Sequence, residues 1–522
     1  MNKLFFFRWI LSMSLCLLLF SCSNTKGNTL PNPQIKDGIA KLSGKIINFH
    51  PNNDVKDYRT LTLTVSHPVT AEICHRTAEV NEDGAFAFEI PMQCDYAIGY
   101  IQPEMKSYDE FYVCLTSGKE TKIEIIYKET TGQLISINQT DSLGLTSTDL
   151  INMNQVSEKL IRYRSLETAG YAKTPDEFVQ RAKIRLNYRL KMIADNKLVS
   201  QYASNINFSE NAKIFITNII KIRSLDWHFL LYRDMMQIGY LDAGNKDLEN
   251  FNPPEPNKKH YAFLKDFNLS NPQYLYQGHY PEVLQKILSN DTLNIQPIGD
   301  IPVDQWMKEV KKILSKLVGF DKGLFYDMLA ANSYARQFDV EQRPLSDKQK
   351  ENIRNYFKDE KGETAKILLK KDNEISKMAA KQIPLVVNET PAVSKEQLMD
   401  AIVSKYRGKV VVVDFWATWC APCLNAMKKS ADLKGELKDR NVVFVYLTNL
   451  SSPQKLWEAR IKGIGGEHYY LNADEWEYTM RTFDFEYIPS YVIFDTNGEL
   501  VQKYVSYPGN DEMQAMIEKL LP

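Results

Sequence analysis

The spacing of apolar residues divides the chain into three stretches, and the first has the pattern of β-structure. Residues 42–49 and 121–127 alternate apolar with polar side chains, which is the period of a half-buried strand. Asn-Glu-Asp-Gly at 81–84 precedes a further alternating run at 85–90, and a turn of this kind between such runs favours a hairpin. We therefore predict a small antiparallel β-sandwich over residues 40–130.

From residue 145 to residue 381 the apolar positions recur at helical spacing instead. Thr174-Pro-Asp-Glu177 combines an N-cap residue, a proline at the first helical position and a capping-box glutamate, so a helix should begin there. We predict an all-α region and find no recognisable catalytic constellation in it. Aromatic side chains at the same spacing are expected in its core, the alternative being a ligand groove: Trp227, Phe229, Tyr232 and Tyr240.

Strand and helix patterns alternate in residues 385–522. A β-branched run at 410–415 is followed by a helical pattern at 421–437 and by a second apolar strand at 442–447. The chain then closes with a hairpin around the turn 495–498 and a final helix. This order predicts an α/β domain with a mixed central sheet and helices on both faces.

The N-terminus has the form of an export signal. After a short basic stretch, residues 9–20 are an apolar run that is too short to span a bilayer. The run ends in Ser21-Cys22 and is followed by polar residues, which resembles a bacterial lipobox. We predict that residues 1–21 are a signal peptide and that residues 22–39 are a flexible tether lipidated at Cys22. An ordinary cleaved signal with an incidental cysteine is the alternative.

The same residues predict where the protein is located. Ser23 follows Cys22, and by analogy a serine there does not signal retention in the inner membrane. Several acyl chains would hold the protein stably at a bilayer. We therefore expect a lipid-anchored protein of the cell envelope that faces the periplasm, on the outer rather than the inner membrane, in an oxidising compartment.

Composition narrows the functional classes. The 522 residues are 44% hydrophobic and 25% charged with a net charge of −1, which suits about three globular domains and gives no basic surface for nucleic acid. Cys74, Cys94 and Cys114 lie in the predicted sandwich. We expect structural or free thiols there, because one disulfide would leave one cysteine over and no Cys-x-x-Cys or close histidine pair suggests a metal site.

The main candidate for chemistry is Cys420-Ala-Pro-Cys423, directly after the strand 410–415. A zinc site would need further ligands, and His468 is the only histidine in residues 385–522. Between a strand and a helix this spacing indicates a redox dithiol. Cys420 would sit at the helix N-terminus, where the helix dipole and free N–H groups stabilise a thiolate. Cys423, about one turn on, would be more buried and could close a disulfide on Cys420.

Asp414 is the candidate acid–base group. It lies near the end of the apolar run Val410-Val-Val-Val, where burial should raise its pKa toward neutrality and suit it to proton transfer. The alternative is a solvated aspartate at a strand end, whose pKa would stay in the ordinary range.

Taken together, these residues resemble the thioredoxin superfamily. Asp414-Phe-Trp-Ala-x-Trp419-Cys420-x-Pro-Cys423 is followed about 65 residues later by Ile488-Pro489. The preceding Tyr-Arg-Gly-Lys-Val and the N-terminal signal are similar to the extracytoplasmic TlpA/ResA-type branch. The layout with a β-domain in front is similar to lipoproteins of the Bacteroidetes.

The resemblance covers residues 385–522 and implies a role for each matching position. Cys420 would be the attacking thiol and Cys423 the resolving one, the two forming the redox-active disulfide. Asp414 would accept and return the proton of Cys423. Three residues would contact the substrate, through an aromatic ring, a backbone and a cis-proline respectively: Trp419, Ile488 and Pro489.

One departure limits the resemblance. Many TlpA/ResA-type sequences read Cys-x-x-Cys-x-x-Glu-x-Pro. This chain has Ala426 in place of the glutamate and Lys428 in place of the proline. The missing carboxylate leaves proton handling to Asp414, and a ResA-type role in cytochrome c maturation is not implied.

These patterns predict an extracytoplasmic thiol–disulfide oxidoreductase, acting as a reductase on protein disulfides. Its partners would be those disulfides and a membrane or periplasmic thiol electron donor, with the membrane reached through the lipid anchor. No cofactor, metal or nucleic acid is expected. The alternative is a binding or scaffold lipoprotein in which the thioredoxin-like module is accessory. A thiol peroxidase is disfavoured, because the Thr-x-x-Cys pattern is absent.

Overall fold

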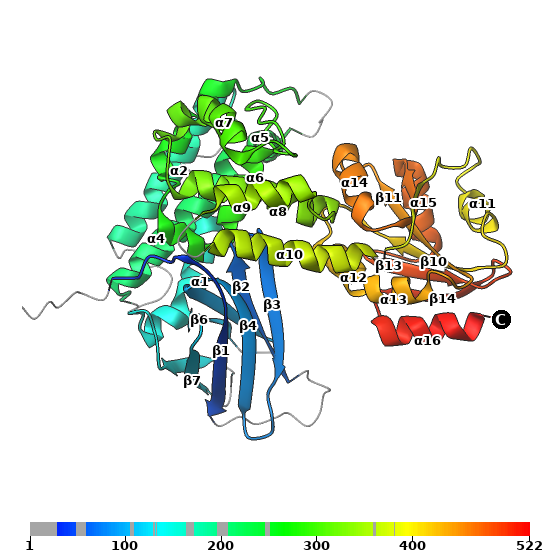
Figure 1. Cartoon of the computed structure of the whole chain (residues 1–522), viewed down its shortest axis with the longest axis horizontal. Helices are drawn as coiled ribbons and strands as arrows, with labels where there is room; N and C mark the ends of the chain where they lie inside the picture. The colour runs from blue at the N-terminus through cyan, green and yellow to red at the C-terminus, as the bar shows by residue number, and fades with distance from the viewer. Residues whose placement is uncertain are drawn as a thin grey trace, which may run out of the picture.

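The computed structural model arranges the chain as a larger N-terminal body beside a smaller C-terminal domain (Figure 1). None of the helices in the described part of the chain is both long and apolar enough to cross a membrane. The predicted signal peptide and Cys22 lie outside the described residues. The structure describes residues 29–47, 59–104, 109–128, 131, 133–162, 172–195, 207–245, 251–358, 362–380 and 382–521.

Two four-stranded sheets form the sandwich, with the strand orders β4-β1-β7-β8 and β3-β2-β5-β6. Strand β7 shows why the sequence pattern works, because its exposed and buried residues alternate. Strand β1 pairs antiparallel with β4 but parallel with β7, so the prediction of a purely antiparallel sandwich is wrong for this pair. The strands are β1 (Ile35–Ile47), β2 (Thr60–His67), β3 (Glu72–Glu79), β4 (Ala85–Cys94), β5 (Tyr96–Pro103), β6 (Phe111–Thr116), β7 (Glu120–Tyr127) and β8 (Leu134–Gln139).

Helices follow the sandwich as far as residue 380. The predicted helix start at Thr174 is confirmed, since its side chain accepts a hydrogen bond from the backbone N–H of Glu177. The helices are α1 (Ser147–Arg162), α2 (Pro175–Ala194), α4 (Glu210–Ser224), η2 (Leu225–Phe229), α5 (Tyr232–Asp242), η3 (Lys258–Phe267), η4 (Pro272–Tyr276), α6 (His279–Leu288), α7 (Val303–Val318), α8 (Leu324–Arg336), η5 (Gln337–Glu341), α9 (Asp347–Tyr356) and α10 (Glu363–Ala380).

The sandwich and the helices share one continuous hydrophobic core. The rings of Tyr112 in β6 and Phe215 in α4 meet edge to face, with centroids 5.6 Å apart. Asn332 in α8 is fully buried and donates a hydrogen bond to the carbonyl of Pro68, just after β2, at 2.9 Å. The two predicted regions therefore pack as a single body around this shared core.

The segment before β1 is also part of this body. Leu30 is only 4% exposed, and its backbone N–H donates to the side chain of Asn211 in α4 at 2.8 Å. The side chain of Gln273 in turn donates to the carbonyl of Leu30 at 2.9 Å. The prediction of a flexible tether over 22–39 is therefore wrong for its described part, because a buried leucine and specific backbone hydrogen bonds hold it.

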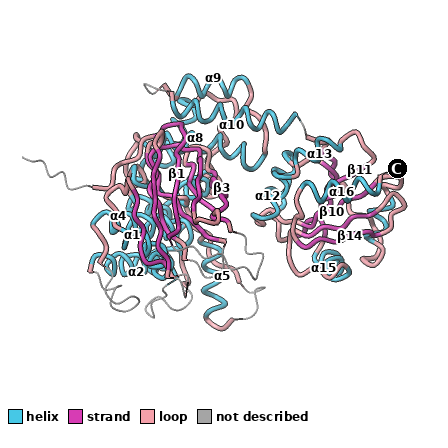
Figure 2. The backbone as a smooth tube through the Cα atoms, turned by 90° about the horizontal axis from the view of Figure 1, so that it is seen from below, coloured by secondary structure: helices cyan, strands magenta, loops and turns pink. Residues whose placement is uncertain are grey.

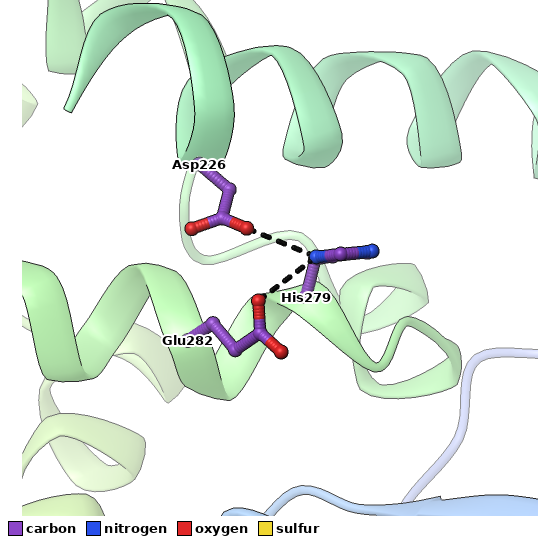
Figure 3. A group of neighbouring side chains, drawn as sticks. All are labelled: Asp226, His279 and Glu282. Carbon is purple, nitrogen blue, oxygen red and sulfur yellow. Dashed lines mark hydrogen bonds and ion pairs between the residues drawn. The ribbon is translucent and has the colours of Figure 1, made fainter. Parts of the chain in front are cut away.

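A charge network joins η2 to α6 within the helices (Figure 3). His279 Nδ1 lies 2.9 Å from a carboxylate oxygen of Asp226 and 3.0 Å from one of Glu282. The ammonium of Lys286 donates to the other oxygen of Asp226, whose side chain is fully buried. Burial alone would lower the pKa of His279, but the hydrogen bonds to Asp226 and Glu282 outweigh it and raise the pKa to about 9. Two carboxylates and two cations thus balance one another.

The C-terminal domain is built on a six-stranded sheet in the order β14-β13-β10-β11-β12-β9. Central β10 pairs parallel with β11 and antiparallel with β13, which confirms the predicted mixed sheet. The helix predicted over 421–437 divides at Ser430. The elements are β9 (Leu385–Val387), α11 (Leu398–Ser404), β10 (Val410–Phe415), α12 (Ala421–Lys429), α13 (Ala431–Leu437), β11 (Val442–Asn449), α14 (Gln454–Arg460), η6 (Ile461–Gly463), β12 (Gly466–Leu471), α15 (Ala473–Thr482), β13 (Ser490–Phe494), β14 (Leu500–Val505) and α16 (Asn510–Leu520).

Helices cover both faces of this sheet, as predicted (Figure 2). Helices α12, α13, α14 and α16 contribute to one core cluster, and α11 contributes to the cluster on the opposite face. All six residues of β10 are buried. The strand that leads to the two cysteines is therefore enclosed on every side, which fixes the position of the loop after it.

We expect the charge network around His279 to make the stability of the helices depend on pH. The folded pKa of about 9 lies above the ordinary 6.5, so the contribution is complete below pH 6.5 and is lost as the pH rises through about 9. Hydrogen exchange of residues 279–288, corrected for the intrinsic effect of pH, should therefore become faster across this interval. In a His279→Gln variant that pH dependence should disappear; its persistence would contradict the assignment.

Candidate active site

The loop between β10 and α12 carries the two predicted cysteines, and a disulfide joins them. Cys420 is the N-cap residue of α12 and Cys423 lies in its first turn, with Cα atoms 5.3 Å apart. The backbone N–H of Cys423 donates to Cys420 Sγ at 3.2 Å. After reduction, an N–H directed at the sulfur from the positive end of a helix would stabilise a Cys420 thiolate. Both cysteines are buried, but Cys423 is fully enclosed whereas Cys420 is 3% exposed, so the small opening to solvent lies at Cys420.

The loop before β13 forms the other wall of the site. The Ile488-Pro489 peptide bond is cis, as the resemblance implied. Because β13 pairs antiparallel with β10, with Ser490 opposite Phe415, this loop comes back to the cysteines. The carbonyl oxygen of Ile488 lies 3.8 Å from Cys420 Sγ. A backbone group of the loop is thus adjacent to the sulfur at which an incoming chain would bind.

Exposed apolar side chains lie on the loops beside the disulfide. Trp419 is 63% exposed, and its indole N–H donates to the hydroxyl of Ser451 at 3.0 Å. Leu450, next to that serine, is 64% exposed, and Tyr487 on the cis-proline loop is 70% exposed. Leu450 and Tyr487 were not identified from the sequence, because isolated apolar residues in loops carry no periodic signal. Large apolar side chains that remain in water at one place mark a contact surface.

Asp414 lies on the face of β10 that α12 covers. Residues two apart in a strand share a face, and Val412 and Trp416 belong to the same core cluster as Cys423. Asp414 itself is 6% exposed, and its Oδ1 atom is buried without a hydrogen-bond partner. Burial raises the pKa of Asp414 to about 7, although the charge of Lys434 and the nearby Tyr491 hydroxyl act in the opposite direction. The expectation of a desolvated acid is confirmed, and a solvated strand end is excluded.

A small cavity lies against this carboxyl group. Its volume is about 20 Å³, which is room for one water molecule. A water molecule in this space would lie beside the carboxyl group and could exchange a proton with it. Its polar lining comes from strands β10, β11 and β13, from the junction of α12 and α13, and from the segment after β14: Asp414, Tyr446, Tyr491, Ser430 and Tyr507.

Lys434 is a second buried charge near Asp414 and was not identified from the sequence. It lies on α13, is 4% exposed, and donates from Nζ to the hydroxyl of Tyr446 at 3.0 Å. The sequence does contain a signal for its burial. Positions 427, 431 and 434 recur at helical spacing and are Met427, Ala431 and Lys434, so the lysine falls on the apolar face of the predicted helix.

The other cysteines of the described residues lie outside the site and form no disulfide. Cys74, Cys94 and Cys114 are free, and the last two are buried. Burial raises the pKa of Cys114 to about 12 and raises those of Cys74 and Cys94 as well. Of the two possibilities that the sequence left open for these residues, the described structure has free thiols without a disulfide.

The His279 network also meets the distance condition for metal ligands. One ligand atom each of Asp226, His279 and Glu282 lie within 4.8 Å of one another (Figure 3). However, Lys286 already occupies an oxygen of Asp226, and a protonated His279 satisfies both carboxylates. We therefore assign these residues to the structural charge network described above.

Comparison with known proteins bears on the C-terminal domain alone. A family model described as thioredoxin-like matches residues 408–500. The thiol-disulfide oxidoreductase ResA of Geobacillus kaustophilus is 26% identical over 119 residues, which is 23% of this chain and 67% of the relative. YkuV of Bacillus subtilis, also named a thiol-disulfide oxidoreductase, is 26% identical over 135 residues, 25% of this chain and 84% of the relative. The chain spans about two thirds of the length of the ResA proteins.

Solved structures match the same part of the chain. The thioredoxin domain of a thiol-disulfide oxidoreductase from Bacteroides vulgatus is 18% identical and covers 23% of this chain and 84% of its own, with a TM-score of 0.20. The C-terminal domain is therefore a thioredoxin-like domain of the TlpA/ResA type, that of a thiol–disulfide oxidoreductase.

Proposed function

We propose that the protein is an extracytoplasmic reductase of protein disulfides that works through Cys420 and Cys423. The observation that supports this most directly is the disulfide at the start of α12, in which Cys420 is the N-cap residue and 3% exposed and Cys423 is fully buried. The export signal predicted for residues 1–21 and the lipid predicted on Cys22 support a place in the cell envelope, on the outer membrane. The reducing direction follows from the resemblance to TlpA/ResA-type proteins.

In the reduced enzyme, the Cys420 thiolate attacks one sulfur of a substrate disulfide and the other substrate sulfur leaves as a thiolate. Asp414 takes the proton of Cys423, whose thiolate then attacks Cys420 Sγ and releases the second substrate sulfur. Two electrons pass to the substrate, whose two thiolates take up protons from solvent, while Asp414 gives the single proton of Cys423 back to solvent. The enzyme is left with the Cys420–Cys423 disulfide. A membrane or periplasmic thiol donor then reduces that disulfide again.

The surroundings of the dithiol suit an extended or unfolded segment of a protein. The Ile488 backbone and Pro489 would lie along the substrate chain, and Trp419 would cover it from the other side. The exposed Leu450 and Tyr487 extend this apolar surface. Cystines in partly unfolded proteins are flanked by exposed apolar side chains, which such a surface would bind.

Replacement of Cys420 by serine should abolish reduction of insulin disulfides by the full chain. A hydroxyl group at neutral pH provides no thiolate to attack the disulfide. The matched control is Cys114→Ser, which changes a buried thiol outside the site and should leave the rate unchanged. Unaltered activity of the Cys420 variant would remove this residue as the nucleophile.

Replacement of Asp414 by asparagine should slow the resolving step about 10- to 100-fold at pH 8, because an amide cannot accept the Cys423 proton. In the wild-type enzyme this step should accelerate with pH around a midpoint near 7, the pKa of Asp414, and the variant should lack this dependence. Rapid-mixing measurements on a preformed mixed disulfide would test it, with the exposed Asp439→Asn as control.

The Asp414 variant should also be more stable than the wild type at neutral and alkaline pH. The folded pKa lies above the ordinary value, so the wild-type protein loses stability as the pH rises from about 4 through about 7. An asparagine at this position does not ionise, so the variant does not lose stability over this pH range. A lower unfolding midpoint for Asp414→Asn at pH 8 would contradict the assigned burial.

Replacement of Cys423 by serine should trap substrates in cells as mixed disulfides on Cys420, because the resolving thiol is missing. Adducts separated without reductant and identified by mass spectrometry should be cell-envelope proteins with disulfides. A Cys420→Ser/Cys423→Ser double variant is the control and should trap none. Adducts made solely with cytoplasmic proteins would contradict the proposed compartment.

A further inference from the structure

Lys434 is an unusual residue to find in a protein core. It is 4% exposed, and its ammonium group donates to the Tyr446 hydroxyl at 3.0 Å and to the Ile464 carbonyl at 3.4 Å. No carboxylate of the described residues lies within 4.0 Å of it to form an ion pair. A buried cation without such a partner destabilises a fold. A lysine at this position therefore calls for a role beyond packing.

The geometry connects Lys434 to Asp414 through one tyrosine. Tyr446 lies directly opposite Asp414 in the pairing of β10 with β11. Its ring lines the small cavity beside the Asp414 carboxyl group, while its hydroxyl accepts the hydrogen bond from Lys434. The ammonium and the carboxyl group thus approach the same side chain within one enclosed region, where charges interact strongly because water is excluded.

The other titratable groups that face Asp414 are uncharged near neutral pH. Burial raises the pKa values of Tyr446, Tyr491 and Tyr507. His468 stacks on the far side of Tyr446, with ring centroids 4.7 Å apart, and burial lowers its pKa to about 4. Lys434 is therefore the positive charge that acts on Asp414 among the described residues. Burial lowers the pKa of Lys434 itself to about 8, so its ammonium group is charged at pH 7 and loses its proton at more alkaline pH.

The N-terminal body encloses Lys434 from the other side. A cavity of about 30 Å³ lies between α13 and α10, and Lys434 lines it together with Ile375 and Met378 of α10. Figure 1 shows the C-terminal end of α10 reaching α12 and α13. Nearby, Asp339 of η5 lies 3.8 Å from both Lys428 and Arg460 of the C-terminal domain. The larger body thus shields the lysine from solvent.

We propose that Lys434 is a positioning residue of the dithiol reaction, whose buried ammonium keeps Asp414 ionised so that it can accept the Cys423 proton. Helix α10 takes part by keeping water away from this ammonium, which links the N-terminal body to the chemistry of the C-terminal domain. The inference rests on the proposed function as far as the reaction is concerned. The effect of one buried group on the other is a property of the folded chain and can be measured without substrate.

A Lys434→Met variant of the full chain tests the proposal. Loss of the positive charge should move the midpoint of Asp414 titration upward by about one pH unit or more, followed as the infrared band of the protonated carboxyl group that Asp414→Asn lacks. A shift of one unit lowers the ionised fraction at pH 7 from about one half to about one tenth. The resolving step should then slow about fivefold at pH 7 and recover at pH 9.

Matched variants separate charge from packing. Lys438→Met removes an exposed charge just after α13 and should leave the midpoint unchanged. Lys434→Arg keeps the charge, the adjoining cavity giving it room, and should keep the midpoint within about half a unit of the wild-type value. Lys434→Gln is prepared in parallel, so that a neutral variant remains if the methionine variant does not fold.

A double variant decides how the lysine acts. If Lys434 works through Asp414, then adding Lys434→Met to Asp414→Asn should slow the resolving step no further, whereas a general structural defect would add to the loss. An unchanged Asp414 midpoint in both neutral Lys434 variants would overturn the proposal even if the wild type reduces insulin. Failure of the wild type to reduce insulin would overturn the proposed function alone, since the infrared titration needs no substrate.

Discussion

The enclosure of strand β10 is the constraint on which the site depends. All six of its residues are buried between two paired strands and two layers of side chains, so the strand cannot tilt or slide without disrupting both layers. This rigidity places the cysteines at the start of α12 and holds a carboxyl group where water cannot solvate it. A desolvated acid is thermodynamically unfavourable, and the surrounding sheet supplies the burial that keeps it in place.

The N-terminal body, which is the larger part of the chain, is a second structural unit with its own hydrophobic core. Its sandwich and helices bury apolar side chains against each other, and hydrogen bonds with Asn211 and Gln273 hold the backbone of Leu30 against the helices. The body meets the C-terminal domain through α10 and η5, close to Lys434. Its position suggests that the body does more than hold the redox domain at a distance, because it forms part of the environment of a buried charge.

Much of this could be predicted from the sequence where the signal is local. The strand 410–415, the Cys-x-x-Cys turn and Ile488-Pro489 lie in short segments whose residue types restrict the backbone directly. The parallel pairing of β1 with β7, the anchoring of Leu30 and the burial of Lys434 depend on contacts between residues far apart in the chain. A periodic pattern indicates which face is buried, but it does not indicate which distant segment covers that face.

The three free thiols have a consequence for a protein that exchanges disulfides. With a pKa of about 12, the Cys114 thiol is ionised in only about one molecule in 10⁵ at pH 7, and Cys94 is buried in the same way. Such groups react far too slowly to compete with a thiolate at a helix N-terminus. Burial therefore keeps Cys94 and Cys114 out of disulfide exchange, so these two cysteines can be present in the same chain as a reactive dithiol without forming wrong disulfides.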